Sequence, residues 1–285
     1  AMLGLASGGI LNIFGDMLLI FGLDLGVRGA GISTAVSQYI SMAILISPFL
    51  RRKVQSRIHI RYVTRSFADI KNIIATGFPS LMRQGLNSIS VMILNLCSAP
   101  YGDAAIAAMS IVTRIIMFLF CIALGIGQGF QPVCGFNYGA RLYHRVKEGF
   151  WFCVKVAAVF LLVIGALGFA FAPQLIALFR DDPGVIAIGT VALRFQCVTF
   201  FFQAWITMSN MMLQTIGRTV PATFVAMARQ GIFFIPLVWL LSLSPLGLLG
   251  VQMAQSVSDL LTLAAAVPIQ LYVLRQMSQM QPAKV

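Results

Sequence analysis

Residues 104–130, AAIAAMSIVTRIIMFLFCIALGIGQGF, carry a single charged side chain, Arg114, in an otherwise uncharged run. A helix of about 20 apolar residues is long enough to cross a hydrocarbon core of ~30 Å. Similar stretches recur along the chain, and we place eight of them at roughly 3–23, 30–50, 77–98, 104–130, 150–172, 185–212, 222–243 and 250–274. The pattern predicts an all-α, polytopic transmembrane helix bundle.

The composition of the whole chain supports the same class. Of the 285 residues 59% are hydrophobic and 10% are charged, and the mean hydropathy is +0.91. A soluble domain needs about 25% charged residues, because its surface faces water. The surface of this chain is therefore expected to face lipid.

The net charge of +12 is distributed unevenly over the connections between the spans. If the connections alternate between the two faces of the membrane, one face receives thirteen cations: Arg51, Arg52, Lys53, Arg57, Arg61, Arg65, Lys71, Arg141, Arg145, Lys147, Arg218, Arg275 and Lys284. The other face has Arg28 and Arg180, accompanied by four aspartates. This asymmetry follows the positive-inside rule and predicts that residues 51–76 and the C-terminus are cytoplasmic. The charge is explained by topology and anionic lipid, and no nucleic-acid partner is expected.

Cysteine and histidine offer no framework for metal or disulfide chemistry. The five cysteines are scattered singly through or beside apolar spans without a CxxC pair, and the two histidines, His59 and His144, lie in predicted loops. Cofactors are therefore not expected.

The chain also resembles itself. Gly26-Val27-Arg28-Gly29 and the helix after it match Gly247-Leu248-Leu249-Gly250 and its following helix, 221 residues further on. Both copies run the same way through the membrane, as in the parallel repeats of some transporters. The later copy has four more helices before it, in spans three to six. We therefore expect two pseudo-symmetric six-helix lobes, the first truncated to two helices.

This repeat gives a domain organisation with three parts. Residues 1–50 form the last two helices of the amino-terminal lobe, and residues 77–285 form the carboxy-terminal six-helix lobe. Between them, residues 51–76 form a basic cytoplasmic linker, in which Ser66–Ile74 has the pattern of a capped amphipathic helix.

Several motifs resemble one known family. These are Leu11-Asn12-Ile13 with Asp16, Gly29-Ala30-Gly31-Ile32-Ser33-Thr34, Gly77-Phe78-Pro79-Ser80 with Arg83-Gln84-Gly85, and Gly125–Pro132 leading into Gly135–Ala140. Together they resemble helices five to twelve of the twelve-helix multidrug and toxic compound extrusion (MATE) family. The resemblance implies a V-shaped pair of lobes around a central cavity. It also implies antiport of organic, mostly cationic compounds against protons or sodium. The partners would be such small molecules, the lipid bilayer and the missing amino-terminal helices of the same protein, in the plasma or inner membrane.

Asp16 is the strongest candidate for ion coupling. A carboxylate inside a spanning helix costs a few kcal/mol by insertion scales, so it is a functional hypothesis by default. Asn12 lies one turn earlier on the same face, and Thr34 lies as far after the predicted turn at Leu25 as Asp16 lies before it. An acid, an amide and a hydroxyl suit a proton site or coordination of sodium, the only metal expected. In the resembled family these positions belong to the amino-terminal ion site.

Other polar residues are weaker candidates. Asp259, with Gln255, Ser256 and Ser258 around it, is the other acid inside a predicted span, where a packing hydrogen bond is an equal explanation. Arg83, Lys155 and Arg229 are expected near cytoplasmic ends of spans, where long cationic side chains reach the interface. The candidates for lining a cavity are Arg114, Arg194, Gln128 and Gln131.

Three other functions are weighed against antiport. A flippase for a lipid-linked saccharide or cell-wall precursor would need several cations for a pyrophosphate, and Arg83, Arg114 and Arg194 keep this alternative open. An intramembrane enzyme would need a nucleophile with a base, and the predicted spans contain no histidine. A purely structural subunit would leave Asn12, Asp16 and Thr34 unexplained.

Overall fold

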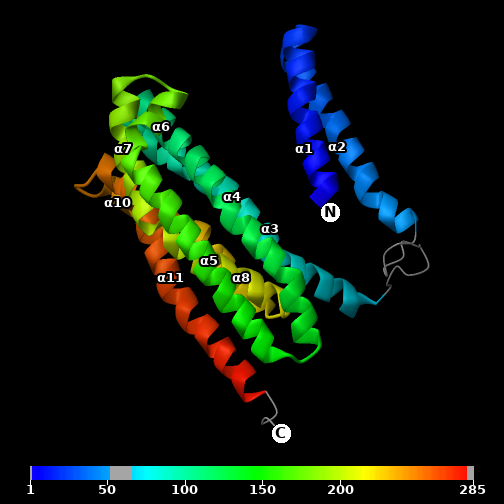
Figure 1. Cartoon of the computed structure of the whole chain (residues 1–285). Helices are drawn as coiled ribbons and strands as arrows, with labels where there is room; N and C mark the ends of the chain where they lie inside the picture. The colour runs from blue at the N-terminus through cyan, green and yellow to red at the C-terminus, as the bar shows by residue number, and fades with distance from the viewer. Residues whose placement is uncertain (1, 52–65, 281–285) are drawn as a thin grey trace. The chain divides into compact units, whose positions relative to one another are not determined.

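The computed structural model describes residues 2–51 and 66–280 (Figure 1). All regular structure in these ranges is helical. The chain divides into two compact units, Ala1–Ile70 and Lys71–Val285. Each unit has its own polar site, so each is described by itself.

The first unit is a helical hairpin, drawn in blue in Figure 1. It consists of α1 (Met2–Asp16), the π-helical segment η1 (Met17–Gly22) and α2 (Gly26–Leu50). Gly26 opens α2 with φ +51°, a left-handed conformation that glycine adopts without strain. A buried stripe of small residues, Gly29, Ser33, Ser37 and Ser41, follows every fourth position of α2. Such small residues let two helix backbones approach closely in lipid.

The second unit is a bundle of longer rods. Its elements are α3 (Phe67–Ser98), η3 (Ala99–Tyr101), α4 (Asp103–Gly139), α5 (Tyr143–Ala170), α6 (Ala172–Phe179), α7 (Pro183–Thr199), η4 (Phe200–Phe202), α8 (Gln203–Thr215), α9 (Thr219–Met227), η5 (Ala228–Ile232), α10 (Phe234–Leu243) and α11 (Leu248–Gln279). Two of the rods are interrupted. The 3₁₀ turn η4 separates α7 from α8, and the π-helical segment η5 separates α9 from α10.

Six helical rods of the described residues are long and apolar enough to span a membrane: Gly26–Leu50, Asp103–Gly139, Tyr143–Ala170, Pro183–Thr215, Thr219–Leu243 and Leu248–Gln279. The chain is therefore a multi-pass membrane protein. Two of the eight predicted spans are helical but are not both long enough and apolar enough to meet this description. The apolar part of the first is short, Ala6–Gly22. The third lies in α3, which is long but carries Arg83, Gln84 and Asn87 near its middle.

The segment that precedes the third predicted span differs from the expected separate amphipathic helix. Residues 67–76 form the first turns of α3, which continues without a break to Ser98 and carries Pro79 inside it. Most of the predicted linker, residues 52–65, lies outside the described residues.

The core of the second unit combines alanines with a few large side chains. Ala108, Ala157 and Ala192 are fully buried, which brings helices close together. Phe150 fills the space beside them and makes edge-to-face contacts with Trp151 and Trp205. This packing holds α4, α5, α7 and α8 together. Hydrogen bonds link α3 to the bundle, from Ser90 Oγ to Gln230 O and from Gln214 Nε2 to Ser80 Oγ.

Candidate functional sites

Asn12 and Thr34, both predicted site residues, meet between α1 and α2. Asn12 Nδ2 donates to Thr34 Oγ1 and to Ser33 Oγ, each at 3.3 Å. The Ser33 hydroxyl in turn donates to the Asn12 backbone oxygen at 3.1 Å, and Thr34 Oγ1 donates to Ala30 O at 2.9 Å. These bonds use the Asn12 nitrogen and leave its side-chain oxygen without a hydrogen bond from the described residues.

Asp16 lies at the last position of α1, directly before the π-helical segment η1. Its side chain is half-buried, and its buried Oδ1 has no hydrogen-bond partner among the described residues. Asp16 bonds to neither Asn12 nor Thr34, although Asn12 is one helical turn away on the same helix. The hairpin thus holds an amide, two hydroxyls and a carboxylate with an available oxygen.

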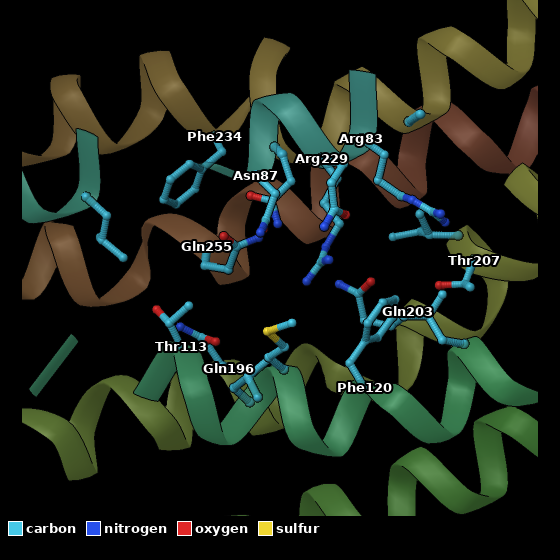
Figure 2. A pocket seen from close by; sticks show the side chains of 18 of the residues that line it. Arg83, Asn87, Thr113, Phe120, Gln196, Gln203, Thr207, Arg229, Phe234 and Gln255 are labelled. Atoms are coloured by element: carbon cyan, nitrogen blue, oxygen red, sulfur yellow. The ribbon is translucent and has the colours of Figure 1, made fainter. Parts of the chain in front are cut away.

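A pocket of about 200 Å³ lies inside the second unit (Figure 2). α3 forms one wall with Arg83, Gln84, Asn87 and Leu94, and the other elements supply the remainder. The lining mixes apolar groups such as Phe120 and Phe234 with side-chain amides and hydroxyls from several helices. Those polar groups are Thr113, Gln196, Gln203, Thr207, Asn210, Gln230 and Gln255.

Two arginines are the charged residues of this lining, Arg83 and Arg229. Arg229 Nε forms an ion pair with Asp259 Oδ1 at 2.9 Å, and the two side chains are 17% and 4% exposed. Gln255 Nε2 also donates to this oxygen, at 3.1 Å. The Arg229 guanidinium lies 5.4 Å from the centre of the Phe120 ring. Asp259, a predicted second polar site, is thus held in a buried ion pair.

Arg83 and Gln203 differ from this satisfied pair. Arg83 is partly buried and forms no hydrogen bond or ion pair with any described residue. Gln203 is fully buried, and neither its Nε2 nor its Oε1 has a partner in the described part of the chain. Buried amides are normally hydrogen-bonded, so this exception requires an explanation.

The four predicted cavity-lining residues are absent from the lining of this pocket. Arg114 and Gln128 are exposed on α4, and Gln131 is half-buried on the same helix. Arg194 is exposed on α7, donates to Phe169 O at 3.4 Å and lies 5.2 Å from the centre of the Phe169 ring. Whether any of the four faces another cavity stays a prediction.

Sequence reasoning did not place Arg83 and Arg229 among the cavity-lining residues, because it put both near the ends of spans; Arg83 entered only as a cation of the flippase alternative. Since α3 begins at Phe67, Arg83 lies near its middle. Arg229 lies in η5, near the middle of Thr219–Leu243. It also missed Ser33, which the four-residue repeat of small residues in α2 could have revealed. The proximity of Asn12 and Thr34, by contrast, could be predicted from the hairpin and the position of its turn alone.

The described residues contain no group of three or more His, Cys, Asp or Glu side chains that could hold a metal ion. The five cysteines are all free thiols. The polar groups of the two sites are therefore carboxylate, amide, hydroxyl and guanidinium, which bind protons, hard cations or anions rather than transition metals.

Six rods of the described residues that are long and apolar enough to span a membrane, with polar sites within the two units, define a multi-pass membrane protein. The sequence profile of the MatE family matches residues 79–265. The chain belongs to the MatE family.

Named relatives agree with this family. The chain is 29% identical to the multidrug export protein MepA of Staphylococcus saprophyticus over 278 residues, which cover 96% of this chain and 60% of MepA. It is 27% identical to MepA of Staphylococcus aureus strain NCTC 8325, over 275 residues that cover 96% of this chain and 60% of the relative. The chain thus spans about three fifths of the length of these relatives.

Solved structures share the fold. A crystal structure of MATE in the straight conformation gives a TM-score of 0.88 at 24% identity, over 98% of this chain and 63% of the other. An outward-facing multidrug resistance MATE family transporter of the MOP superfamily gives 0.87 at 24% identity, over 98% and 63%.

Proposed function

We propose that the protein is a secondary active antiporter that exports organic, mostly cationic compounds in exchange for protons or sodium by alternating access. Membership of the MatE family supports this proposal, as do relatives named multidrug export proteins. The observation that carries it is the unbonded buried oxygen of Asp16 beside the Asn12–Ser33–Thr34 cluster.

Antiport requires one group whose state changes with ion and substrate alike. A carboxylate meets this requirement, because it is neutral when protonated and anionic when free, and the anion attracts an organic cation or sodium. The ion and the substrate then influence each other's binding only because each binds one conformational state of the protein more tightly than the other. In the first hairpin Asp16 is the one acid on a helix, since Asp24 lies in the turn.

Proton and sodium coupling use the same cluster differently. Sodium is a hard cation that is coordinated by oxygens, and Asp16, the Asn12 side-chain oxygen and the Thr34 hydroxyl would provide them. A proton needs only Asp16, with the neighbours solvating the charged form. No resident cofactor takes part in either mode.

We assign the protein to the plasma or inner membrane with the α4–α5 turn and the C-terminus in the cytoplasm. This turn and the first residues of α5 carry Arg141, Arg145 and Lys147, whereas the α6–α7 connection carries Arg180 with Asp181 and Asp182. In a variant without native cysteines, a cysteine at His144 should react only from the cytoplasm and one at Asp182 only from outside. Reaction of both from one side would contradict this orientation.

A flippase for a lipid-linked saccharide or cell-wall precursor is the second candidate. Arg83 and Arg229 on one pocket favour it, because guanidinium groups bind phosphate oxygens in pairs of hydrogen bonds.

The test is ion-driven transport in proteoliposomes that contain the product of the complete gene. Ethidium is loaded, and an inward proton gradient or an inward sodium gradient is imposed in separate runs. Export driven by one gradient is expected, and the run that shows it identifies the coupling ion. Absence of ethidium export under both gradients, with scrambling of a fluorescent lipid-linked saccharide, would favour the flippase instead.

A further inference from the structure

We propose that the pocket of the second unit is a binding site for a small oxyanion, a carboxylate or phosphate carried by a compact molecule. The site lies within the bundle and uses none of the residues assigned to ion coupling. It therefore does not depend on the proposed antiport activity.

The charge of the lining is the first argument. Arg83 and Arg229 are its charged members, and the carboxylate nearest to them, Asp259, already accepts hydrogen bonds from Arg229 and Gln255 at one oxygen. No carboxylate of the described residues lies within ion-pair distance of Arg83. Cations inside a membrane protein are paired with anions or face water, because an isolated charge in low dielectric is costly. The pocket therefore has one positive charge in excess.

The Arg229 side chain is positioned to act as a ligand. Its Nε is used by Asp259, and the ring of Phe120 lies beside the guanidinium. Both terminal NH₂ groups remain free of hydrogen bonds to the described residues. Figure 2 shows this side chain extending into the cavity. A planar guanidinium whose terminal nitrogens are free suits the two oxygens of a carboxylate or phosphate.

Gln203 is the second, independent observation. This side chain is 0% exposed, faces the pocket and has no partner at either amide atom in the described part of the chain. In Figure 2 its amide group points toward the same space as those of Gln196 and Asn87. An unpaired buried amide costs a few kcal/mol. A rotation of the side chain that turns Nε2 toward the cavity would let a ligand oxygen accept from it and remove that cost.

The size and the apolar part of the lining limit the ligand. The pocket is partly open, and its volume of about 200 Å³ is small beside the ~300–1,000 Å³ of most sites for drug-sized molecules. Phe234, Met109 and Ile206 give the cavity an apolar side. The part of the ligand that lies inside the pocket is thus an anionic group with at most one ring or a short alkyl chain.

The test is binding to the purified product of the complete gene, measured by calorimetry in a neutral, non-ionic detergent. Sodium benzoate and sodium phosphate serve as anion probes, and tetramethylammonium serves as the cation control. Benzoate, phosphate or both should bind, and the probe that binds identifies the preferred oxyanion. Tetramethylammonium should not bind in this pocket.

Matched variants locate the binding. Arg83→Gln should lower the affinity for the anion at least about tenfold, because it removes one charged hydrogen bond. Arg114→Gln removes an equal charge from an exposed position of α4 outside the pocket and should leave affinity unchanged. Gln203→Leu should weaken binding and raise the unfolding temperature of the ligand-free protein. Failure of both anions to bind, or equal weakening by the two arginine variants, would overturn the proposal.

Discussion

The hairpins α1–α2 and α10–α11 share the same backbone frame, a turn glycine followed by a stripe of small buried residues, but carry different charged groups. Gly26 and Gly247, 221 positions apart, have φ values of +51° and +52°. The buried stripe of α2, Gly29, Ser33, Ser37 and Ser41, aligns at this offset with the buried Gly250, Ala254, Ser258 and Thr262 of α11. The first hairpin carries a carboxylate with an unbonded oxygen, whereas Asp259 of the second is held in a buried ion pair with Arg229 of η5, beside a positively charged pocket.

The difference shows that one set of positions determines how closely the two helices pack, and another set determines which charged groups the hairpin carries. Every fourth residue of the second helix is small, and this spacing sets the closeness of the two backbones. The reactive groups are elsewhere: at the same offset Asp16 corresponds to Leu237, and Asp259 to Gln38. A π-helical segment lies near each charge, since η1 follows Asp16 directly and η5, which precedes α10, contains Arg229, the partner of Asp259. Such segments often occur at functional sites.

The ion pair of the second hairpin gives the largest expected effect on stability. Arg229→Gln leaves the Asp259 carboxylate buried without its cation and should lower the free energy of unfolding by about 3–5 kcal/mol. Asp16→Asn in the first hairpin breaks no hydrogen bond and should change stability little. Denaturant unfolding in detergent measures both. The double variant Arg229→Gln with Asp259→Asn should recover part of the loss, and equal instability of the single and double variants would contradict the pairing.

Gly29 and Gly250, in the first turns of α2 and α11, should show the next largest effect on stability when replaced by alanine. A Cβ at Gly250 would overlap the Leu241 backbone oxygen, and one at Gly29 would lie 2.8 Å from Leu19 O. Alanine at either position should cost about 1–3 kcal/mol by overpacking, with the larger loss at Gly250. Gly31→Ala, where a Cβ meets nothing within 4 Å, is the matched control and should cost nothing. Unchanged stability of Gly250→Ala would contradict the claim that the two hairpins share the same close packing of their helices.

The smallest effect concerns the hydroxyls of the stripe. Ser33→Ala removes hydrogen bonds to the side chain and the backbone of Asn12 and should cost about 1 kcal/mol. Ser37→Ala is the control, since this equally buried hydroxyl makes no hydrogen bond within the described ranges. Unfolding measured in parallel should rank Ser33→Ala as the less stable variant. The reverse order would remove the Asn12 cluster from the packing of the hairpin.

Much of the fold was predictable because its signals are local. Apolar runs predicted the helical rods, and the motif Gly26–Gly29 located both hairpin turns. Asn12 and Thr34 could be paired because a hairpin fixes the register of its two helices. The pocket could not be predicted in this way, since eight elements contribute to it and the start of α3 decides the depth of Arg83. Arg114 and Arg194 were chosen by their position in apolar runs, which does not specify the face of a helix.

The division of roles between the hairpins is tested most directly by ion-driven ethidium export. Vesicles with equal amounts of the complete wild-type protein, Asp16→Asn or Asp24→Asn are compared under the gradient that drives export. Asp24→Asn removes an equal charge from the exposed turn of the same hairpin and should export at the wild-type rate. Asp16→Asn should export no faster than vesicles without protein, because the group that exchanges ion for substrate is gone. Export by Asp16→Asn at the rate of Asp24→Asn would contradict the account.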